Sequence, residues 1–175
     1  MEIEKVSNLR NEKFKSVEKK PGVYRWWFKK DAAFMLVKSM QMWLPDQDRF
    51  LIRTIGGETY VALYFGISKD MRGRIKWHAS QKHTPSTVSK GFLSTLRQTL
   101  SALLTTRMSV SYNVVNTFID DNCIWEWEYS DDPHKVELAE LSRDDCYYPL
   151  NVKDNKTICK DAIDWLKQER ARYRN

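Results

Sequence analysis

The stretch "ALYFGISKDMRGRIKWH" (Ala62 to His78) is the most informative segment of the sequence. It begins as an apolar run that ends at Gly66, a pattern that is typical of a buried strand. After Asp70 the chain carries Arg74 and His78, and a spacing of four residues places both side chains on one face of a helix. The segment therefore predicts a strand that leads directly into a helix, with a guanidinium and an imidazole near the end of that strand.

The composition is that of one globular domain. The chain has 175 residues, of which 42% are hydrophobic, and this is enough for a single core. It contains no apolar run of membrane-spanning length, so we expect no membrane partner. Residues 1–20 have no signal-peptide pattern and are expected to form a loosely ordered polar arm before a single domain in residues 21–175. Cys123, Cys146 and Cys159 form no CxxC motif, which favours a cytoplasmic protein with reduced, buried thiols and no zinc site.

Charge is distributed unevenly along the chain. From Lys69 to Arg107 there are eight Lys or Arg residues and one acid, whereas from Phe118 to Asp145 there are ten acids and two bases. A basic stretch of this kind is typical of contact with a polyanion, and an acidic stretch can hold a divalent cation. Two solvated faces would explain the same pattern, so charge alone does not decide between these interpretations.

The predicted fold class is α+β, with a small, mainly antiparallel β-sheet flanked by helices. The hydrophobic pattern and the turn residues predict strands over 21–28 and 122–130 and a hairpin around Gly56 and Gly57. Helices are expected over 31–44, 70–81, 94–106 and 158–172, with a further helix starting at Pro133.

Several side chains in these elements can act on a phosphate group. Tyr24 and Tyr64 supply phenols from two neighbouring strands. Arg74 carries a guanidinium, which matches phosphate oxygens in a bidentate manner, and His78 carries an imidazole that titrates near neutral pH. The helix that starts at Pro133 adds two candidate metal ligands, the carboxylates of residues 137 and 140.

These residues resemble the motifs of the GIY-YIG nuclease superfamily. The motifs that carry the resemblance are "GVY" (22–24), "YFG" (64–66), "MRGRIKWH" (71–78), "DPHKVELAEL" (132–141) and "PLN" (149–151). The segment with Arg74 and His78 is similar to that of the GIY-YIG restriction endonucleases. The helix "STLRQTLSALL" (94–104) and the ending "PLNVKDN … WLKQERAR" (149–172) look like a bacterial and phage branch. The resemblance implies a divalent-metal-dependent endonuclease that hydrolyses DNA phosphodiester bonds, and a role in restriction, defence or repair is compatible with it.

The resemblance also implies a role for each matched residue. Tyr24 would act as general base or orient the nucleophile, and Tyr64 would position water and phosphate. Arg74 would neutralise charge that develops on the phosphoryl oxygens, and His78 would assist proton transfer by pairing with a tyrosine.

The metal, expected to be Mg²⁺ or Mn²⁺, would be held by a glutamate of the fourth motif. Glu137 is favoured because Leu138 and Leu141 can flank it, and Glu140 remains the alternative. Asn151 would brace the site.

The spacing of the two tyrosines departs from the family pattern. Tyr24 and Tyr64 are forty residues apart, further than is usual in the family. We attribute the excess to an inserted helix over 31–44, and a middle strand over 49–55 would change the sheet order.

Contacts with nucleic acid are expected from four basic residues, Lys69, Arg72, Lys76 and Arg97. A non-catalytic nucleic-acid-binding module and an interaction domain without a nucleic-acid role are the alternatives. The expected partner is DNA, with RNA not excluded, bound by a monomer or a homodimer.

Overall fold

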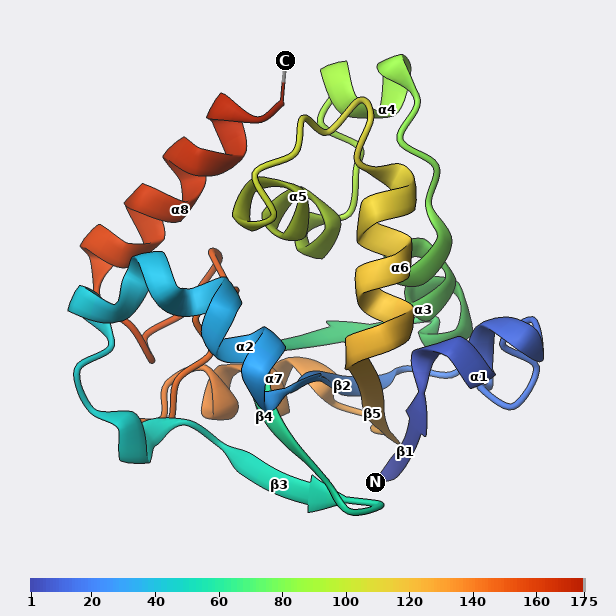
Figure 1. The fold of residues 1–175 in the computed structure, drawn as a ribbon. Helices are drawn as coiled ribbons and strands as arrows, with labels where there is room; N and C mark the ends of the chain where they lie inside the picture. Colours follow the sequence, from blue (N-terminus) through green and yellow to red (C-terminus); the bar gives the residue numbers. More distant parts are fainter. Residues whose placement is uncertain (175) are drawn as a thin grey trace.

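The computed structural model describes residues 1–174. Its centre is a five-stranded antiparallel sheet with the strand order β1-β5-β2-β4-β3, which confirms the predicted α+β class (Figure 1). The strands are β1 (Glu2–Lys5), β2 (Gly22–Lys29), β3 (Ile52–Ile55), β4 (Glu58–Ser68) and β5 (Cys123–Tyr129).

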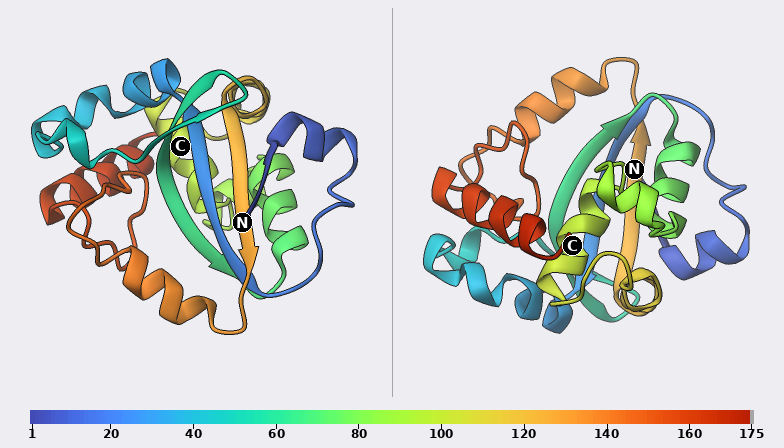
Figure 2. Two further views of the ribbon diagram at one scale, coloured as in Figure 1. Left: turned by 90° about the horizontal axis from the view of Figure 1, so that it is seen from below. Right: turned by 90° about the horizontal axis from the view of Figure 1, so that it is seen from above.

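Helices cover both faces of this curved sheet (Figure 2). The α-helices are α1 (Val6–Asn11), α2 (Lys30–Val37), α3 (Met71–Ser80), α4 (Pro85–Ser89), α5 (Thr95–Leu103), α6 (Tyr112–Asn122), α7 (Pro133–Glu140) and α8 (Lys160–Arg172). Two 3₁₀ helices, η1 (Lys38–Trp43) and η2 (Gln47–Arg49), follow α2. Helices α2, α3, α5, α6 and α8 contribute to the larger core on one face, whereas the segment that follows α7 packs on the other face.

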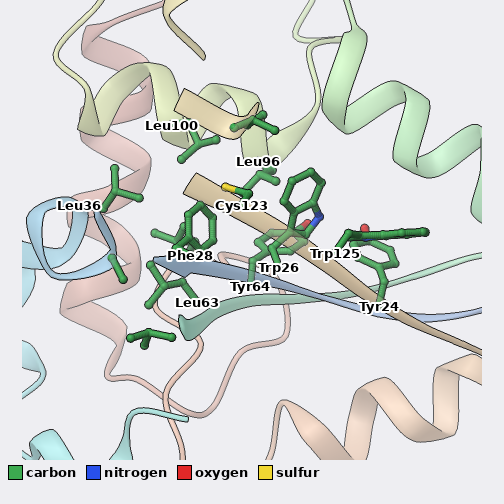
Figure 3. Close-up of a cluster of buried hydrophobic side chains, with 14 of the residues drawn as sticks. Tyr24, Trp26, Phe28, Leu36, Leu63, Tyr64, Leu96, Leu100, Cys123 and Trp125 are labelled. Atoms are coloured by element: carbon green, nitrogen blue, oxygen red, sulfur yellow. The ribbon is translucent and has the colours of Figure 1, made fainter. Parts of the chain in front are cut away.

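The central strand β2 supplies both cores because its side chains alternate between the two faces. Tyr24, Trp26 and Phe28 enter the larger cluster, where they meet Tyr64 of β4 (Figure 3). Trp27 belongs to the smaller cluster on the opposite face. The strand is therefore buried on both sides, which explains its almost uninterrupted run of apolar and aromatic residues.

The insertion between the two tyrosine strands leaves the centre of the sheet intact. Gly56 and Gly57 form the expected hairpin turn with φ values of +58° and +83°. The resulting strand β3 lies at the edge of the sheet and pairs only with the first part of β4. A middle position for residues 49–55 is thus wrong, and β2 and β4 remain direct neighbours. The predicted helix over residues 31–44 is present as α2 followed by η1.

The expectation of a loose N-terminal arm is also wrong. Strand β1 pairs with β5, and Val6, Leu9, Phe14 and Val17 are buried in the core. These apolar residues are widely spaced among charged ones, so residues 1–20 appear polar on average. Helices α4 and α6 were likewise not predicted.

The cysteines form no disulfide in the structure. Cys123 and Cys146 are buried free thiols as expected, whereas Cys159 is exposed. Among residues 1–174, no helix combines the length and apolar character that a membrane crossing requires.

Candidate active site

The pairing of β2 with β4 brings the two motif tyrosines together. Tyr24 lies opposite Gly66, and Tyr64 lies opposite Trp26. The Tyr24 and Tyr64 rings are stacked, with centroids 6.3 Å apart. A Cβ atom on residue 66 would lie only 2.5 Å from Tyr24 Oη, so the Tyr24 side chain fits across β4 only because glycine stands there.

Helix α3 delivers the imidazole to this pair. Asp70 caps the helix, since its Oδ1 accepts a hydrogen bond of 2.8 Å from the Gly73 N–H. The helix therefore starts directly after β4, and His78, two turns later, is buried against the tyrosines. His78 Nε2 lies 2.8 Å from Tyr24 Oη. Burial, together with the charges of Arg74 and Arg97, holds the pKa of His78 well below its usual range, so the imidazole is neutral at neutral pH.

Arg74 provides a cation that has no acidic partner among residues 1–174. Its guanidinium lies 4.9 Å from the centre of the Trp77 ring. Burial raises the pKa of Tyr24 and of Tyr64, and the charge of Arg74 opposes this increase at both phenols. The guanidinium thus acts on both phenols and retains free donors for an anion.

Glu137 faces the same site from α7. Asp132 caps this helix, and the Glu137 carboxylate is partly buried without a hydrogen-bond or ion-pair partner in the described part of the chain. Burial raises the pKa of Glu137, while His134 and Lys153 act in the opposite direction. A partly buried carboxylate that has no partner in the described part of the chain can bind a cation.

Glu140, three residues later in α7, is held by hydrogen bonds and ion pairs within the protein. Its Oε1 accepts hydrogen bonds from Arg25 Nη2 at 2.8 Å, from Arg143 Nη1 at 3.2 Å and from the Tyr148 hydroxyl. Burial would raise the pKa of Glu140, but the hydrogen bond from Tyr148 and the charge of Arg25 lower it overall. Of the two candidate glutamates, Glu137 is therefore the one that lines the cavity.

Asn151 closes the free edge of β4 beside the site. Its Nδ2 donates to the Phe65 carbonyl at 2.7 Å, and its Oδ1 accepts from the Phe65 N–H at 2.9 Å. The preceding residue, Leu150, donates its N–H to the Leu63 carbonyl. The amide side chain thus replaces a missing strand neighbour, and it holds in place the backbone between Tyr64 and Gly66.

Tyr24, Tyr64, Arg74, Glu137 and Asn151 all line one cavity of about 320 Å³. Its lining includes Tyr24, Tyr64, Gly66, Arg74, Thr95, His134, Glu137, Asn151, Lys153 and Asp154. A second cavity of about 710 Å³ shares Ile67, Arg74 and His134 with the first, so the two are contiguous.

The four basic residues expected to contact nucleic acid have different environments. Lys69 and Lys76 are exposed, whereas Arg72 donates to the backbone carbonyls of Val17 and Lys15. Arg97 is completely buried and is not at a surface that nucleic acid could reach. Its guanidinium donates to His83 Nε2, to the carbonyls of His78 and Ala79, and to Asn116 Oδ1. A count of charges along the sequence does not distinguish such a buried cation from an exposed one.

Several residues at the site were not singled out from the sequence. His134 precedes Glu137 by one helical turn, a spacing that could have indicated a shared face. Lys153 and Asp154 follow the "PLN" motif closely. Ser94, which lies 2.7 Å from His78 Nδ1, was recognised only as the first residue of a predicted helix, and nothing in the sequence connects it to His78.

The comparison with family models identifies the class of protein. Residues 22–172 match the family described as the GIY-YIG catalytic domain, and the chain belongs to this family. The match spans all the motifs that carry the resemblance and agrees with the curved antiparallel sheet and its flanking helices. The family is associated with endonucleases, and its members act on nucleic acids. No curated protein and no solved structure matches the chain significantly.

Proposed function

We propose that the protein is a divalent-metal-dependent endonuclease that hydrolyses DNA phosphodiester bonds in the cavity between β2, β4, α3 and α7. One observation carries this proposal. Within residues 1–174, a guanidinium without an acidic partner (Arg74) and a carboxylate without a hydrogen-bond or ion-pair partner (Glu137) line one cavity together with the buried phenols of Tyr24 and Tyr64. A phosphodiester and a hydrated divalent cation would satisfy both unpaired charges.

The residues at the cavity fit a hydrated Mg²⁺ or Mn²⁺ ion. Within residues 1–174 no group of three metal-ligating side chains is found, so a cage made only of protein ligands is not the arrangement here. A single carboxylate with space for water and phosphate oxygens is how Mg²⁺ is commonly bound at phosphate sites. Glu137 would hold the ion, which when bound would offset phosphate charge and make water more acidic. Burial raises the pKa of Glu137, and a bound cation would favour its ionised form.

The chain's own groups can perform distinct parts of the hydrolysis. Water adds to phosphorus, the bond from phosphorus to one ester oxygen breaks, and a proton is delivered to the departing oxygen, which leaves a phosphate monoester and a hydroxyl. Arg74 would donate to the phosphoryl oxygens as negative charge grows there. Tyr24 would orient the attacking water with its hydroxyl oxygen, and Tyr64 would position the phosphate. His78 would hold Tyr24, and Asn151 would keep the strand backbone in place.

Lys69 and Lys76 are the exposed cations that we assign to the DNA backbone near the cavity. Lys69 also lines the second cavity, which gives room for nucleotides beside the scissile phosphate. Each chain offers one such site, so a monomer would nick one strand, and a double-strand break would need a homodimer or two successive events.

Cleavage of supercoiled plasmid tests the proposal. We expect wild-type protein to nick the plasmid with Mg²⁺ or Mn²⁺, to lose this activity with chelator, and to lose it in Glu137→Gln. A Lys135→Gln variant is the matched control, because residue 135 is exposed on the same helix outside the cavity. Salt-dependent DNA binding without cleavage would instead favour a non-catalytic nucleic-acid-binding module, and cleavage of RNA alone would correct the substrate class.

A further inference from the structure

We propose that Ser94 is a positioning residue that fixes the imidazole of His78 in the tautomer with its proton on Nε2, so that His78 donates a hydrogen bond to Tyr24. The catalytic consequence rests on the proposed nuclease function, whereas the tautomer is a property of the protein alone.

The three side chains form a continuous buried chain of polar atoms. Tyr24 Oη lies 2.8 Å from His78 Nε2, and His78 Nδ1 lies 2.7 Å from Ser94 Oγ. The exposed fractions are 2% for Tyr24, 1% for His78 and 0% for Ser94. Each hydrogen atom in this chain must therefore be placed between protein groups, because an unsatisfied buried polar group is costly.

The direction of the hydrogen bonds follows from the partners of Ser94. Its Oγ accepts a hydrogen bond of 3.3 Å from the Arg97 N–H, as the N-cap of α5. Its own hydroxyl proton then needs an acceptor, and within residues 1–174 the acceptor at hydrogen-bond distance is His78 Nδ1. A proton on Nδ1 would leave the Ser94 hydroxyl without an acceptor. Nδ1 is therefore unprotonated, and the ring proton is on Nε2.

This arrangement makes His78 a hydrogen-bond donor to Tyr24. The Nε2–H group would donate to Tyr24 Oη, which leaves the phenolic proton of Tyr24 for the neighbouring Tyr64 hydroxyl or for a group in the cavity. A donor at Oη stabilises negative charge that develops on this oxygen when a proton passes between water and substrate. In the opposite tautomer, Tyr24 would have to donate its proton to His78, and the proton would be unavailable to Tyr64 or to a group in the cavity.

The second buried histidine provides an internal reference. His83 Nδ1 lies 2.9 Å from the Met108 carbonyl, which can only accept, and His83 Nε2 accepts from Arg97 Nε at 2.7 Å. His83 must therefore carry its proton on Nδ1. The two buried rings are expected in opposite tautomers in the same molecule.

Imidazole ¹⁵N spectra of the full chain at neutral pH test the proposal without DNA. The third histidine, His134, is exposed and is removed by His134→Gln to simplify the spectrum. Contacts of the His78 ring with Tyr24 and Trp26 protons assign its signals. We expect an unprotonated Nδ1 and a protonated Nε2 for His78, and the reverse for His83. A His78 ring with its proton on Nδ1 would overturn the proposal, whether or not any variant folds.

Two variants connect the tautomer to activity. Ser94→Ala should mix the His78 tautomers, leave the His83 signals in place and slow plasmid nicking about tenfold, the effect of one lost hydrogen bond at the reacting group. Ser94→Thr keeps the hydroxyl and should restore both the spectrum and the rate. The predicted spectrum in a wild-type protein that cuts no DNA would support the tautomer and count against the proposed function. An unchanged His78 spectrum in Ser94→Ala would overturn the positioning role of Ser94. It would not bear on the proposed nuclease function.

Discussion

Replacement of Glu137 and of Glu140 by glutamine is expected to separate a functional carboxylate from a structural one. Glu140 is held by three donors, and its side chain is only 13% exposed. The pair with Arg25 dominates, because Arg25 is also buried at 14% exposure, while the more exposed Arg143 adds little. Glu137 has no partner in the described structure.

Loss of one partner of a buried ion pair costs about 3–5 kcal/mol. Arg25 would retain Glu126 at 3.0 Å, so we expect the lower end of this range for Glu140→Gln. At about 3 kcal/mol and roughly 2–4 °C per kcal/mol for a chain of this size, the melting temperature should fall by about 6–12 °C. Glu137→Gln should change the free energy of unfolding by less than about 0.5 kcal/mol.

Thermal unfolding followed by circular dichroism measures both effects under one set of conditions, with chelator present so that bound metal does not contribute. Equal melting temperatures for the two variants would refute the division of roles. A larger decrease in Glu137→Gln than in Glu140→Gln would reverse it.

Three further predictions concern acid stability, the basic residues and the glycine beside Tyr24. Burial lowers the pKa of His83 from its usual 6.5 to about 4, so the unfolded chain binds a proton more readily. The stability that neutral His83 contributes is complete above about pH 6.5 and is lost as the pH falls through about 4, and urea unfolding at several pH values should show this loss. Arg97→Ala should destabilise the fold by more than about 3 kcal/mol because its buried donors serve several acceptors. Lys76→Ala should leave stability unchanged and reduce the salt dependence of DNA binding by about one phosphate contact. Melting curves and fluorescence titrations measure the two effects. A destabilised Lys76→Ala together with a stable Arg97→Ala that binds DNA with reduced salt dependence would contradict both predictions. Gly66→Ala should displace the Tyr24 ring and reduce nicking at least tenfold, since the new Cβ would lie 2.5 Å from Tyr24 Oη, and retention of full activity would show that the ring can move without consequence.

Motifs that combine local pattern with fixed spacing were sufficient to predict the centre of the fold. The strand before Gly66, the capped helix after it and the hairpin at residues 56 and 57 depend on neighbouring residues alone, and all three are present. The same reasoning missed the N-terminal strand, because β1 becomes recognisable only through its pairing with β5, more than a hundred residues away.

The details of the site depended on tertiary contacts that a sequence does not display. The sequence favoured Glu137 over the alternative Glu140 because Leu138 and Leu141 were expected to flank it, but Leu138 is exposed. The orientation of α7 makes the difference, since it directs Glu140 to Arg25 and Tyr148. The charge of Arg97 suggested a surface contact, but the residue is enclosed by the carbonyls of α3 and by His83.

Single-turnover cleavage of a labelled DNA fragment by wild-type protein and by Tyr24→Phe is the most direct test of the central claim. The substitution removes one hydroxyl from the cavity and leaves the ring packed against Tyr64 and Trp125. We predict that the variant stays folded, still binds DNA, and cuts at least about a hundredfold more slowly with Mg²⁺. Equal cleavage rates for wild type and Tyr24→Phe would contradict the claim that this cavity is where the phosphodiester is hydrolysed.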